Sequence, residues 1–331
     1  TVTKAKTMHL TEMQDLSRQK PIDIAFVAMK SYDTEWATAL IRQYLAPDGY
    51  VVSLQNCLNE ERIAGVVGWG KTVGMVASLI SVDMYEPATI RRTVAKGGDK
   101  HTVFRVGEVH GRITKRVEEL RDMVGRIDSA KTTTNLWGER WAKLCQNGMK
   151  NGVSAATGLT GRDCDANDAI RRFSIKLGGE AVRVGQALGY HIEKIGKMEP
   201  ETLARASEGD KAALDEIETI LRPGSNTNPN PRADIQRPSM AQDIRKGRRT
   251  EIEFMNGHVV AVARSIGREA PLSAALTDLA RRFDIPVMAD EAVCTVHDAV
   301  TLVKAEAADV FALKLTKAGG FAMSKGVAAV A

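Results

Sequence analysis

Three polar side chains recur at every fourth position in the stretch WAKLCQNGMKNG, namely Lys143, Asn147 and Asn151. This spacing places them in one row along a helix, beside an apolar stripe rich in tryptophan. A lysine ammonium can give up a proton, and amide side chains can hold a small polar substrate. A solvated helix face is the simplest interpretation of such a row. Two asparagines and two glycines within six residues are poor helix formers, however, and this departure from local preference favours a site.

A carboxylate, Glu251, begins a second amphipathic stretch, EIEFMNG, which we expect to be helical. Its expected apolar side is formed by Ile252, Met255, Val259 and Val262. The helix dipole also favours a carboxylate in the first turn, so spacing leaves open whether Glu251 is structural or functional. Upstream, SMAQ has the spacing of a capping box, which predicts Ser239 as the N-cap and Gln242 as its partner.

The stretch GVVGWGKT, residues 65–72, matches the phosphate-binding pattern G-x-x-x-x-G-K-[ST]. A working loop of this kind follows a strand and begins a helix, because the helix N-terminus directs its free N–H groups at the phosphates. Here the order is reversed, since LNEERIAG before the match favours a helix and VGMVASLISV after it favours a strand. We therefore expect a helix-to-strand turn, with Lys71 solvated, and no nucleotide triphosphate site.

The totals describe a globular chain of 331 residues, long enough for two domains, with 44% hydrophobic and 26% charged residues. The net charge of +5 is mild, no basic tract dominates and aromatics are only 5%, so a nucleic-acid partner is not expected. Four cysteines without a C-x-x-C pair argue against a metal site or disulfides and for a reducing, cytoplasmic compartment. No apolar run approaches the ~18 residues of a membrane span.

The coarse pattern along the chain changes twice. Up to about residue 100, apolar runs such as IDIAFVAM and YVVSLQ alternate with the amphipathic DTEWATALIRQYL, which predicts a largely parallel sheet, while ATIRRTVAK and HTVFRVGEV favour antiparallel edge strands. From about Val117 the sequence has helical periodicity. A proline-rich stretch, residues 222–239, is either a functional loop or a linker. Beyond Phe283, a strand, a helix and a strand are expected.

Four stretches resemble the ketopantoate reductase (2-dehydropantoate 2-reductase) family in order and spacing: VAMKSYDTE, SLQNCLNEERI, WAKLCQNGMKNGVSA and RPSMAQDIRKGRRTEIEFMNG. The resemblance covers about residues 10–280. It implies part of a Rossmann-type α/β domain over residues 1–115, followed over 116–282 by an all-α domain similar to the C-terminal domain of 6-phosphogluconate dehydrogenase. The implied activity is the NADPH-dependent reduction of a small 2-keto acid in pantothenate biosynthesis. A homodimer is a possible assembly.

The resemblance also implies roles for individual residues. Lys143 would be the general acid, and Glu251 would bind the hydroxyl of the substrate. The other implied substrate-binding residues are Asn147, Asn151 and Ser239, and those near the nicotinamide and its ribose are Lys30 and Asn56. These roles are chemically coherent, because hydride transfer to a ketone leaves an alkoxide that needs a proton donor.

The chain differs from the family pattern at two places. It contains no G-x-G-x-x-G after a strand, the turn whose N–H groups hold a pyrophosphate, so we expect weak NADPH binding and impaired activity. Cys57 stands where the family has a glycine after the asparagine of its QN motif, which is expected to crowd the cofactor. The alternative is a non-catalytic remnant that binds or dimerises through its helical domain.

Residues 283–331 resemble two βα units of an enolase-superfamily barrel of the muconate cycloisomerase or mandelate racemase type. The resemblance makes Asp290 a Mg²⁺ ligand and Lys314 a base that removes a proton next to a carboxylate. An eight-stranded barrel cannot close from two strands, so we expect a βαβ segment and no catalysis there. A Mg²⁺-dependent lyase or isomerase is the third functional alternative.

Overall fold

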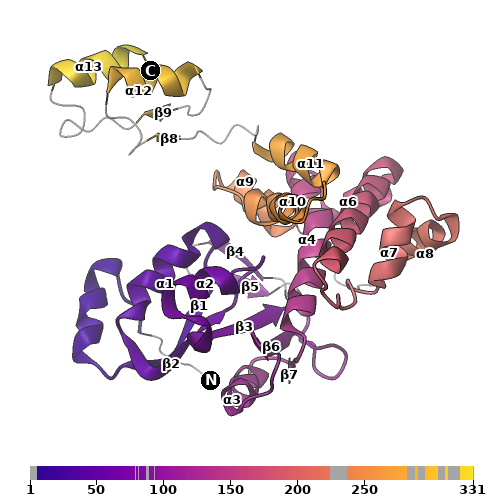
Figure 1. Ribbon diagram of the computed structural model, residues 1–331, viewed down its shortest axis with the longest axis horizontal. Coiled ribbons are helices and arrows are strands. Elements are labelled where there is room, and N and C mark those ends of the chain that lie inside the picture. The colour runs from indigo at the N-terminus through magenta and orange to yellow at the C-terminus, as the bar shows by residue number, and fades with distance from the viewer. Residues whose placement is uncertain are drawn as a thin grey trace. The chain divides into compact units, whose positions relative to one another are not determined.

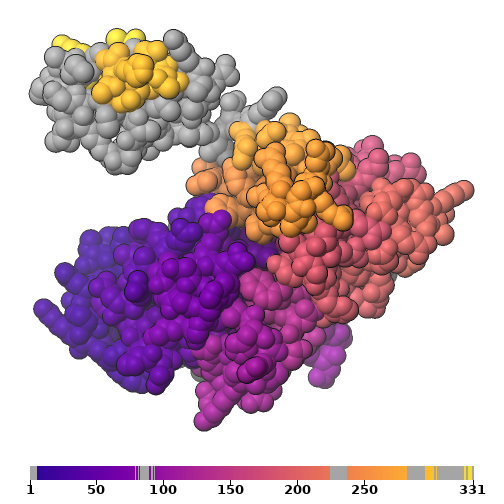
Figure 2. Space-filling model, in the orientation of Figure 1, coloured from indigo at the N-terminus to yellow at the C-terminus, as the bar shows by residue number. Residues whose placement is uncertain are grey.

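The computed structural model describes residues 6–78, 80, 82–86, 89–92, 94–223, 237–281, 288–289, 295–304, 310–311 and 321–330. Contacts divide the chain into two compact units. The first comprises Thr1–Arg245 with Thr250–Arg281, and the second comprises Lys246–Arg249 with Arg282–Ala331. Within the first unit, an α/β part in indigo and violet packs against a helical part in magenta and orange (Figure 1, Figure 2).

The α/β part is built on a five-stranded sheet in the order β1-β2-β3-β6-β7. Its strands are β1 (Ile22–Val27), β2 (Leu45–Ser53), β3 (Thr72–Ala77), β6 (Phe104–Glu108) and β7 (Ala130–Thr132). The first three are parallel, β6 runs antiparallel to β3, and β7 is parallel to β6. The predicted α/β sheet followed by helices is confirmed. The prediction of β6 as an edge strand is wrong, because the short β7 covers its outer side.

A separate two-stranded antiparallel ribbon consists of β4 (Val82–Glu86) and β5 (Thr89–Arg92). The prediction of an antiparallel strand in ATIRRTVAK is therefore confirmed for β5. Its partner is β4, so that this pair lies outside the five-stranded sheet.

Helices cover both faces of the sheet. Successive side chains of a strand point to opposite faces, so one strand packs against helices on both sides. On one face, Tyr50 and Val52 of β2 pack with Leu120 of α3 (Lys115–Gly125). On the other, Val51 packs with Ile63 of α2 (Glu60–Val67). The remaining helical elements of this part are α1 (Thr34–Arg42) and the 3₁₀ turns η1 (Leu10–Arg18), η2 (Ser31–Asp33) and η3 (Trp69–Lys71).

The stretch that matches the phosphate-binding pattern is a helix-to-strand turn, as predicted. α2 ends before Gly68, whose φ of 86° lies in the left-handed region that suits glycine, and β3 starts at Thr72. Lys71 is not simply solvated, because its Nζ donates hydrogen bonds to the carbonyl oxygens of Ala46 at 3.2 Å and Pro47 at 2.7 Å. Its ammonium thus fastens the turn to the start of β2.

The helical part is centred on the long α4 (Leu136–Thr157), which contacts β3 and β6 near its start and α6, α9 and α11 further along (Figure 1). The other helices are α5 (Gly161–Ala166), α6 (Asp168–Ala187), α7 (Pro200–Ser207), α8 (Lys211–Leu221), α9 (Ser239–Arg245), the 3₁₀ turn η5 (Ile252–Phe254), α10 (Asn256–Ser265) and α11 (Pro271–Arg281). α4 is therefore the element that carries side chains from the sheet into the helical part.

Two glycines allow α4 to approach its neighbours closely. A Cβ atom on Gly74 of β3 would lie 2.5 Å from Cδ2 of Leu136, and one on Gly152 would lie 2.8 Å from Cδ2 of Leu276 in α11. Both distances are too short for a Cβ atom unless the leucine side chains move, so the glycines favour this close packing. Judged from the sequence alone, the glycine content of α4 favours a site, but at Gly152 it has a structural reason.

The second unit contains β8 (Met288–Ala289), α12 (Val296–Lys304), β9 (Val310–Phe311) and α13 (Phe321–Val330). β8 and β9 are parallel neighbours, so the predicted strand–helix–strand segment is confirmed. Asp290 and Lys314 lie outside the described residues, as does most of the proline-rich stretch. In the described part of the chain, no helix has the length and apolar character needed to cross a membrane.

Candidate active site

A pocket of about 1210 Å³ lies in the first unit, where residues that follow β1, β2 and β3 face α4 and the start of α9. The carboxyl ends of parallel strands are the usual place for a ligand crevice in α/β sheets. The apolar side of the pocket is formed mainly by Ala28, Met29, Leu54, Ala77, Ile80 and Phe104. All seven predicted site residues line this pocket, namely Lys30, Asn56, Lys143, Asn147, Asn151, Ser239 and Glu251. Their individual roles stay predictions.

α4 turns one polar face toward the pocket. The pocket-lining residues of this helix are Lys143, Gln146, Asn147, Lys150 and Asn151. The first four are half-buried, whereas Leu144, Cys145, Gly148 and Met149 between them are buried. Positions separated by three, four, seven and eight residues share one face of an α-helix. The predicted row of polar residues is therefore present, and it is wider than the sequence pattern suggested.

Asn151 connects α4 to the first turn of α9. Its Oδ1 accepts hydrogen bonds from Ser239 Oγ at 3.1 Å and from the backbone N–H of Met240 at 3.4 Å. The predicted capping box is wrong, because Ser239 is the first residue of α9 and Gln242 Nε2 donates to the carbonyl of Arg237 at 2.9 Å. An amide from another helix supplies the acceptor that the first turn needs.

Glu251 is almost fully buried, with an exposed fraction of 4%. It does not begin an α-helix as predicted but precedes the 3₁₀ turn η5, while Ile252, Met255 and Val259 are buried as expected. Its Oε1 accepts hydrogen bonds from the backbone N–H of Ser31 at 2.9 Å and from Ser31 Oγ at 2.7 Å. These bonds fix the carboxylate at the point where the residues after β1 meet the helical part.

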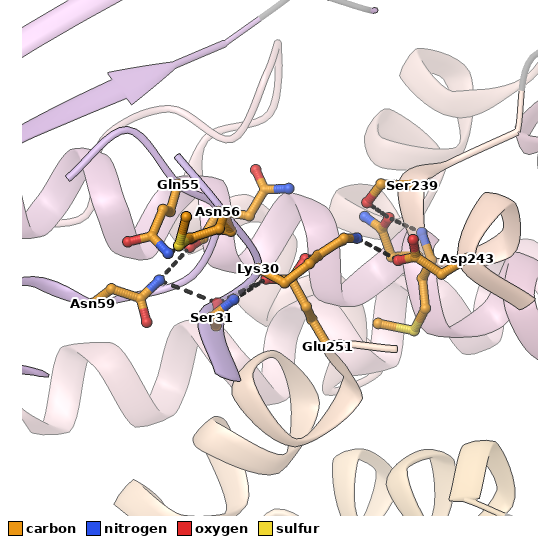
Figure 3. A network of polar contacts seen from close by, with 11 residues as sticks. Lys30, Ser31, Gln55, Asn56, Asn59, Ser239, Asp243 and Glu251 are labelled. Atoms are coloured by element: carbon orange, nitrogen blue, oxygen red, sulfur yellow. Dashed lines mark hydrogen bonds and ion pairs between the residues drawn. The ribbon is translucent and has the colours of Figure 1, made fainter. Parts of the chain in front are cut away.

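Lys30 lies between two carboxylates. Its Nζ is 3.3 Å from Glu251 Oε2 and also pairs with Asp243 of α9 (Figure 3). Burial lowers the pKa of Lys30, but the charges of Glu251 and Asp243 outweigh it and raise the pKa above its usual value. Lys30 is therefore a permanent cation. Sequence reasoning missed Asp243, although it follows Ser239 by four residues and so shares its helix face.

The loop after β2 is held by a chain of amide hydrogen bonds. Asn59 Nδ2 donates to the carbonyl of Asn56 at 2.9 Å and to Ser31 Oγ at 3.1 Å (Figure 3). Gln55 Nε2 donates to the carbonyl of Met29 at 2.8 Å. Asn56 is thus positioned against the residues that follow β1, which is where the pocket begins.

Lys143 has the properties of a proton donor near neutral pH. Its Nζ donates a hydrogen bond to the carbonyl of Ala77, at the end of β3, at 2.5 Å. Burial and the neighbouring charge of Arg140 lower its pKa to about 7. Lys143 and Glu251 thus line the same pocket, as expected, yet each has other hydrogen-bond partners. An amine that titrates near pH 7 can release a proton far more readily than an ordinary lysine.

Arg140 lies one turn before Lys143 on α4 and was not predicted as a site residue. Only 1% of its side chain is exposed, and Nε donates to Oε1 of the fully buried Glu60 at 2.7 Å. Nη1 donates to the carbonyl of Gln55 at 2.7 Å, and Nη2 to that of Ser53 at 2.8 Å. Arg140 therefore fastens the end of β2 to α4 and places a fixed charge near Lys143.

Cys57 is the only residue other than glycine with a positive φ in the described part of the chain, at 65°. This left-handed conformation favours glycine, so the thiol is held at some conformational cost. Cys57 is buried, and burial together with the charge of Glu251 raises its pKa to about 12. It is an unreactive thiol beside the pocket. Asn56, its neighbour, lines the pocket, whereas Cys57 is not among the lining residues.

Comparison with known proteins assigns these features to a family. The description Ketopantoate reductase PanE/ApbA matches residues 1–103, and Ketopantoate reductase PanE/ApbA C terminal matches residues 135–284. These residues belong to the ketopantoate reductase family. The predicted membership is confirmed, and with it an oxidoreductase of the 2-dehydropantoate 2-reductase type.

Individual ketopantoate reductases are distant relatives of the chain. The 2-dehydropantoate 2-reductase of Pyrococcus horikoshii is 25% identical over 253 residues, which cover 76% of this chain and 72% of that protein. The crystal structure of 2-dehydropantoate 2-reductase from Geobacter metallireducens superposes with a TM-score of 0.62 at 24% identity, covering 79% of this chain and 77% of that one. The second likeness supports the fold alone.

The C-terminal residues are similar to a different family. The description Enolase C-terminal domain-like matches residues 268–331. Muconate cycloisomerase 1 of Rhodococcus opacus is 52% identical over 56 residues, which cover 17% of this chain and only 15% of that protein. The predicted resemblance of this segment to part of an enolase-superfamily barrel is confirmed.

Proposed function

We propose that the chain reduces ketopantoate or a related small 2-keto acid to the 2-hydroxy acid with NADPH. The observation that carries the proposal is Lys143, a half-buried lysine with a pKa of about 7 on the polar wall of a pocket at the ends of parallel strands. NADPH, when bound, supplies the hydride for the ketone carbon. The apolar lining at Leu54, Ala77 and Phe104 fits a nicotinamide ring, which has no charge in its reduced form.

Lys143 is assigned the role of general acid. It gives its proton to the ketone oxygen as negative charge develops there, so that the alkoxide is never formed free. The proton is regained from water, and the overall change consumes one proton and one hydride per ketone. Burial, together with the charge of Arg140, keeps the pKa of Lys143 close to the working pH, which makes this proton available.

Glu251 and the amides are assigned to substrate binding. Oε1 of Glu251 accepts two hydrogen bonds from Ser31, and Oε2 lies 3.3 Å from Nζ of Lys30. A carboxylate has about four acceptor sites, so a substrate hydroxyl can still donate to it. Asn147, Asn151 and Ser239 lie on the same wall and hold the keto acid by hydrogen bonds. Lys30 and Asn56, at the strand side of the pocket, are assigned to the nicotinamide ribose.

We also propose that a polypeptide of these 331 residues alone binds NADPH weakly. Its sequence contains no G-x-G-x-x-G turn, and each charge-assisted contact to a pyrophosphate is worth roughly 1.5–3 kcal/mol. Assays therefore need a high cofactor concentration. Fluorescence titration checks this directly, and micromolar or tighter binding of NADPH would contradict it.

The proposed function is tested by following the oxidation of NADPH with ketopantoate at high cofactor concentration. Lys143→Met should lower kcat by about 10² or more, as loss of a general acid does, and Glu251→Gln should mainly raise KM. Lys176→Met is the matched control, because Lys176 is exposed on α6 and outside the pocket. Unchanged kcat in Lys143→Met would refute the assignment. Binding of ketopantoate without any turnover would favour the non-catalytic alternative.

A further inference from the structure

The polar wall of the pocket extends beyond the residues assigned so far. Gln146 and Lys150 line the pocket in a second row next to Lys143 and Asn147. Because an α-helix rises 1.5 Å per residue, the backbone of Lys150 is about 10 Å further along α4 than that of Lys143. A substrate whose ketone lies at Lys143 and that extends along α4 toward Thr157 therefore has its far end on the side of Lys150.

A second cation lines the pocket near the start of α9. Arg237 precedes α9, is half-buried, and its backbone carbonyl is held by Gln242 Nε2 at 2.9 Å. Within the described residues, its guanidinium makes long contacts of 3.4 Å, from Nε and Nη2, to the carbonyl of Gly158. A guanidinium has five N–H donors, so Arg237 retains donors for a ligand.

Lys150 is held at the pocket by an ion pair with Asp165 of α5, which is not a lining residue. An ammonium has three donors, and one such pair leaves two of them for a ligand. The carboxylates that do line the pocket are Asp33 and Glu251, and the recorded contacts of Lys150 and Arg237 lead instead to Asp165 and Gly158. Arg237 therefore brings positive charge to this part of the pocket, and Lys150, whose charge Asp165 balances, adds hydrogen-bond donors.

The chemistry of this wall is unsuited to an alkyl chain. All five residues that α4 turns to the pocket are polar. Covering an ammonium with hydrocarbon removes its hydrating water and provides no hydrogen bond in exchange, which is unfavourable. A second carboxylate at the same place would instead receive charge-assisted hydrogen bonds.

We propose that Lys150 and Arg237 bind an anionic group at the far end of the substrate, so that the chain prefers 2-keto acids with a second carboxylate. The inference rests on the proposed function, because that function places the ketone at Lys143. It makes Lys150 and Arg237 residues that determine specificity, and it makes Gln146 a neutral neighbour that adds a hydrogen bond.

Binding calorimetry on the full chain tests this preference without requiring turnover. The probes are 2-oxoglutarate, which has a second carboxylate, and 2-oxopentanoate, which has the same carbon number without it. We expect the unaltered chain to bind 2-oxoglutarate about tenfold more tightly, which corresponds to about 1.4 kcal/mol. Lys150→Met and Arg237→Met should each reduce that ratio to about threefold or less while leaving the affinity for 2-oxopentanoate within about twofold. Lys176→Met should keep the full ratio.

Equal or tighter binding of 2-oxopentanoate by the unaltered chain would overturn the inference, as would failure of both acids to bind. A preference that survives in both variants would also overturn it. If Lys150 has only a structural role with Asp165, Lys150→Met should lower the melting temperature without changing the ratio. Should Lys150→Met not fold, Arg237→Met decides alone. The proposed function fails separately, when NADPH is oxidised neither with these two acids nor with ketopantoate although the acids bind.

Discussion

Replacing Arg140 by methionine tests the link between the sheet and α4. The substitution keeps the length of the side chain but removes the charge that pairs with Glu60, whose carboxylate is 0% exposed. It also removes the donors to the carbonyls of Ser53 and Gln55. Breaking one side of a buried ion pair costs about 3–5 kcal/mol, because the remaining charge is left without a partner. We expect a loss of this size in the free energy of unfolding.

Urea unfolding followed by circular dichroism measures this loss, and a double-mutant cycle identifies its cause. Glu60→Met combined with Arg140→Met removes both charges. The double variant should therefore lose less free energy of unfolding than the two single variants lose together, by about 2 kcal/mol or more. The control is Arg62→Met, since Arg62 pairs with Glu35 at 3.2 Å with side chains 41% and 63% exposed. Such a surface pair should contribute at most about 1 kcal/mol.

The reasoning would be refuted if Arg140→Met cost no more than Arg62→Met. It would also be refuted if the double variant were as unstable as the sum of the two single variants, because the effects would then be independent. A further readout is catalytic, since Arg140 contributes to the lowered pKa of Lys143 and its removal should raise that pKa.

Three further results are expected. The reduction should lose kcat/KM about tenfold per pH unit above pH 7, because the donor form of Lys143 is present below its pKa of about 7 and lost above it; a flat profile from pH 6 to pH 9 would contradict this. Cys57→Gly should stabilise the chain by up to about 1 kcal/mol in thermal unfolding, since φ at 65° suits glycine, whereas a loss of stability would show that the thiol packs favourably there. Asn151→Ala should lower the free energy of unfolding by about 1 kcal/mol, because Met240 N–H loses its acceptor, and should raise KM. No change in either quantity would show that Asn151 neither supports α9 nor binds the substrate.

Much of α4 could be predicted from the sequence, because helix geometry follows directly from spacing. The row of Lys143, Asn147 and Asn151 is present as expected, and the adjacent Gln146 and Lys150 share its face by the same geometry. That residues from distant segments line one pocket could be predicted only from the resemblance to a family. No periodicity connects residue 30 with residue 251.

Other features depend on contacts that local sequence does not encode. β7 has three residues, too few to show an alternation, so β6 was expected at an edge. The helical spacing of its apolar neighbours predicts that Glu251 begins a helix, yet Glu251 bonds to Ser31 and precedes a 3₁₀ turn. Nothing in the local sequence marks Arg140 as a buried residue, because its partner Glu60 is 80 positions away. Buried ion pairs of this kind can be recognised only once the packing is known.

In the proposed reaction, hydride passes from a nicotinamide cofactor to the keto carbon while Lys143 protonates the oxygen. The most direct measurement uses NADPH deuterated at the transferable position of the nicotinamide ring, a 2-keto acid that the chain binds, and nuclear magnetic resonance of the product. We expect deuterium at C2 of the 2-hydroxy acid. The labelled product should form at least about 10² times more slowly with Lys143→Met and at the normal rate with Lys176→Met. A product without deuterium at C2, or an equal rate of label transfer in Lys143→Met, would contradict the account.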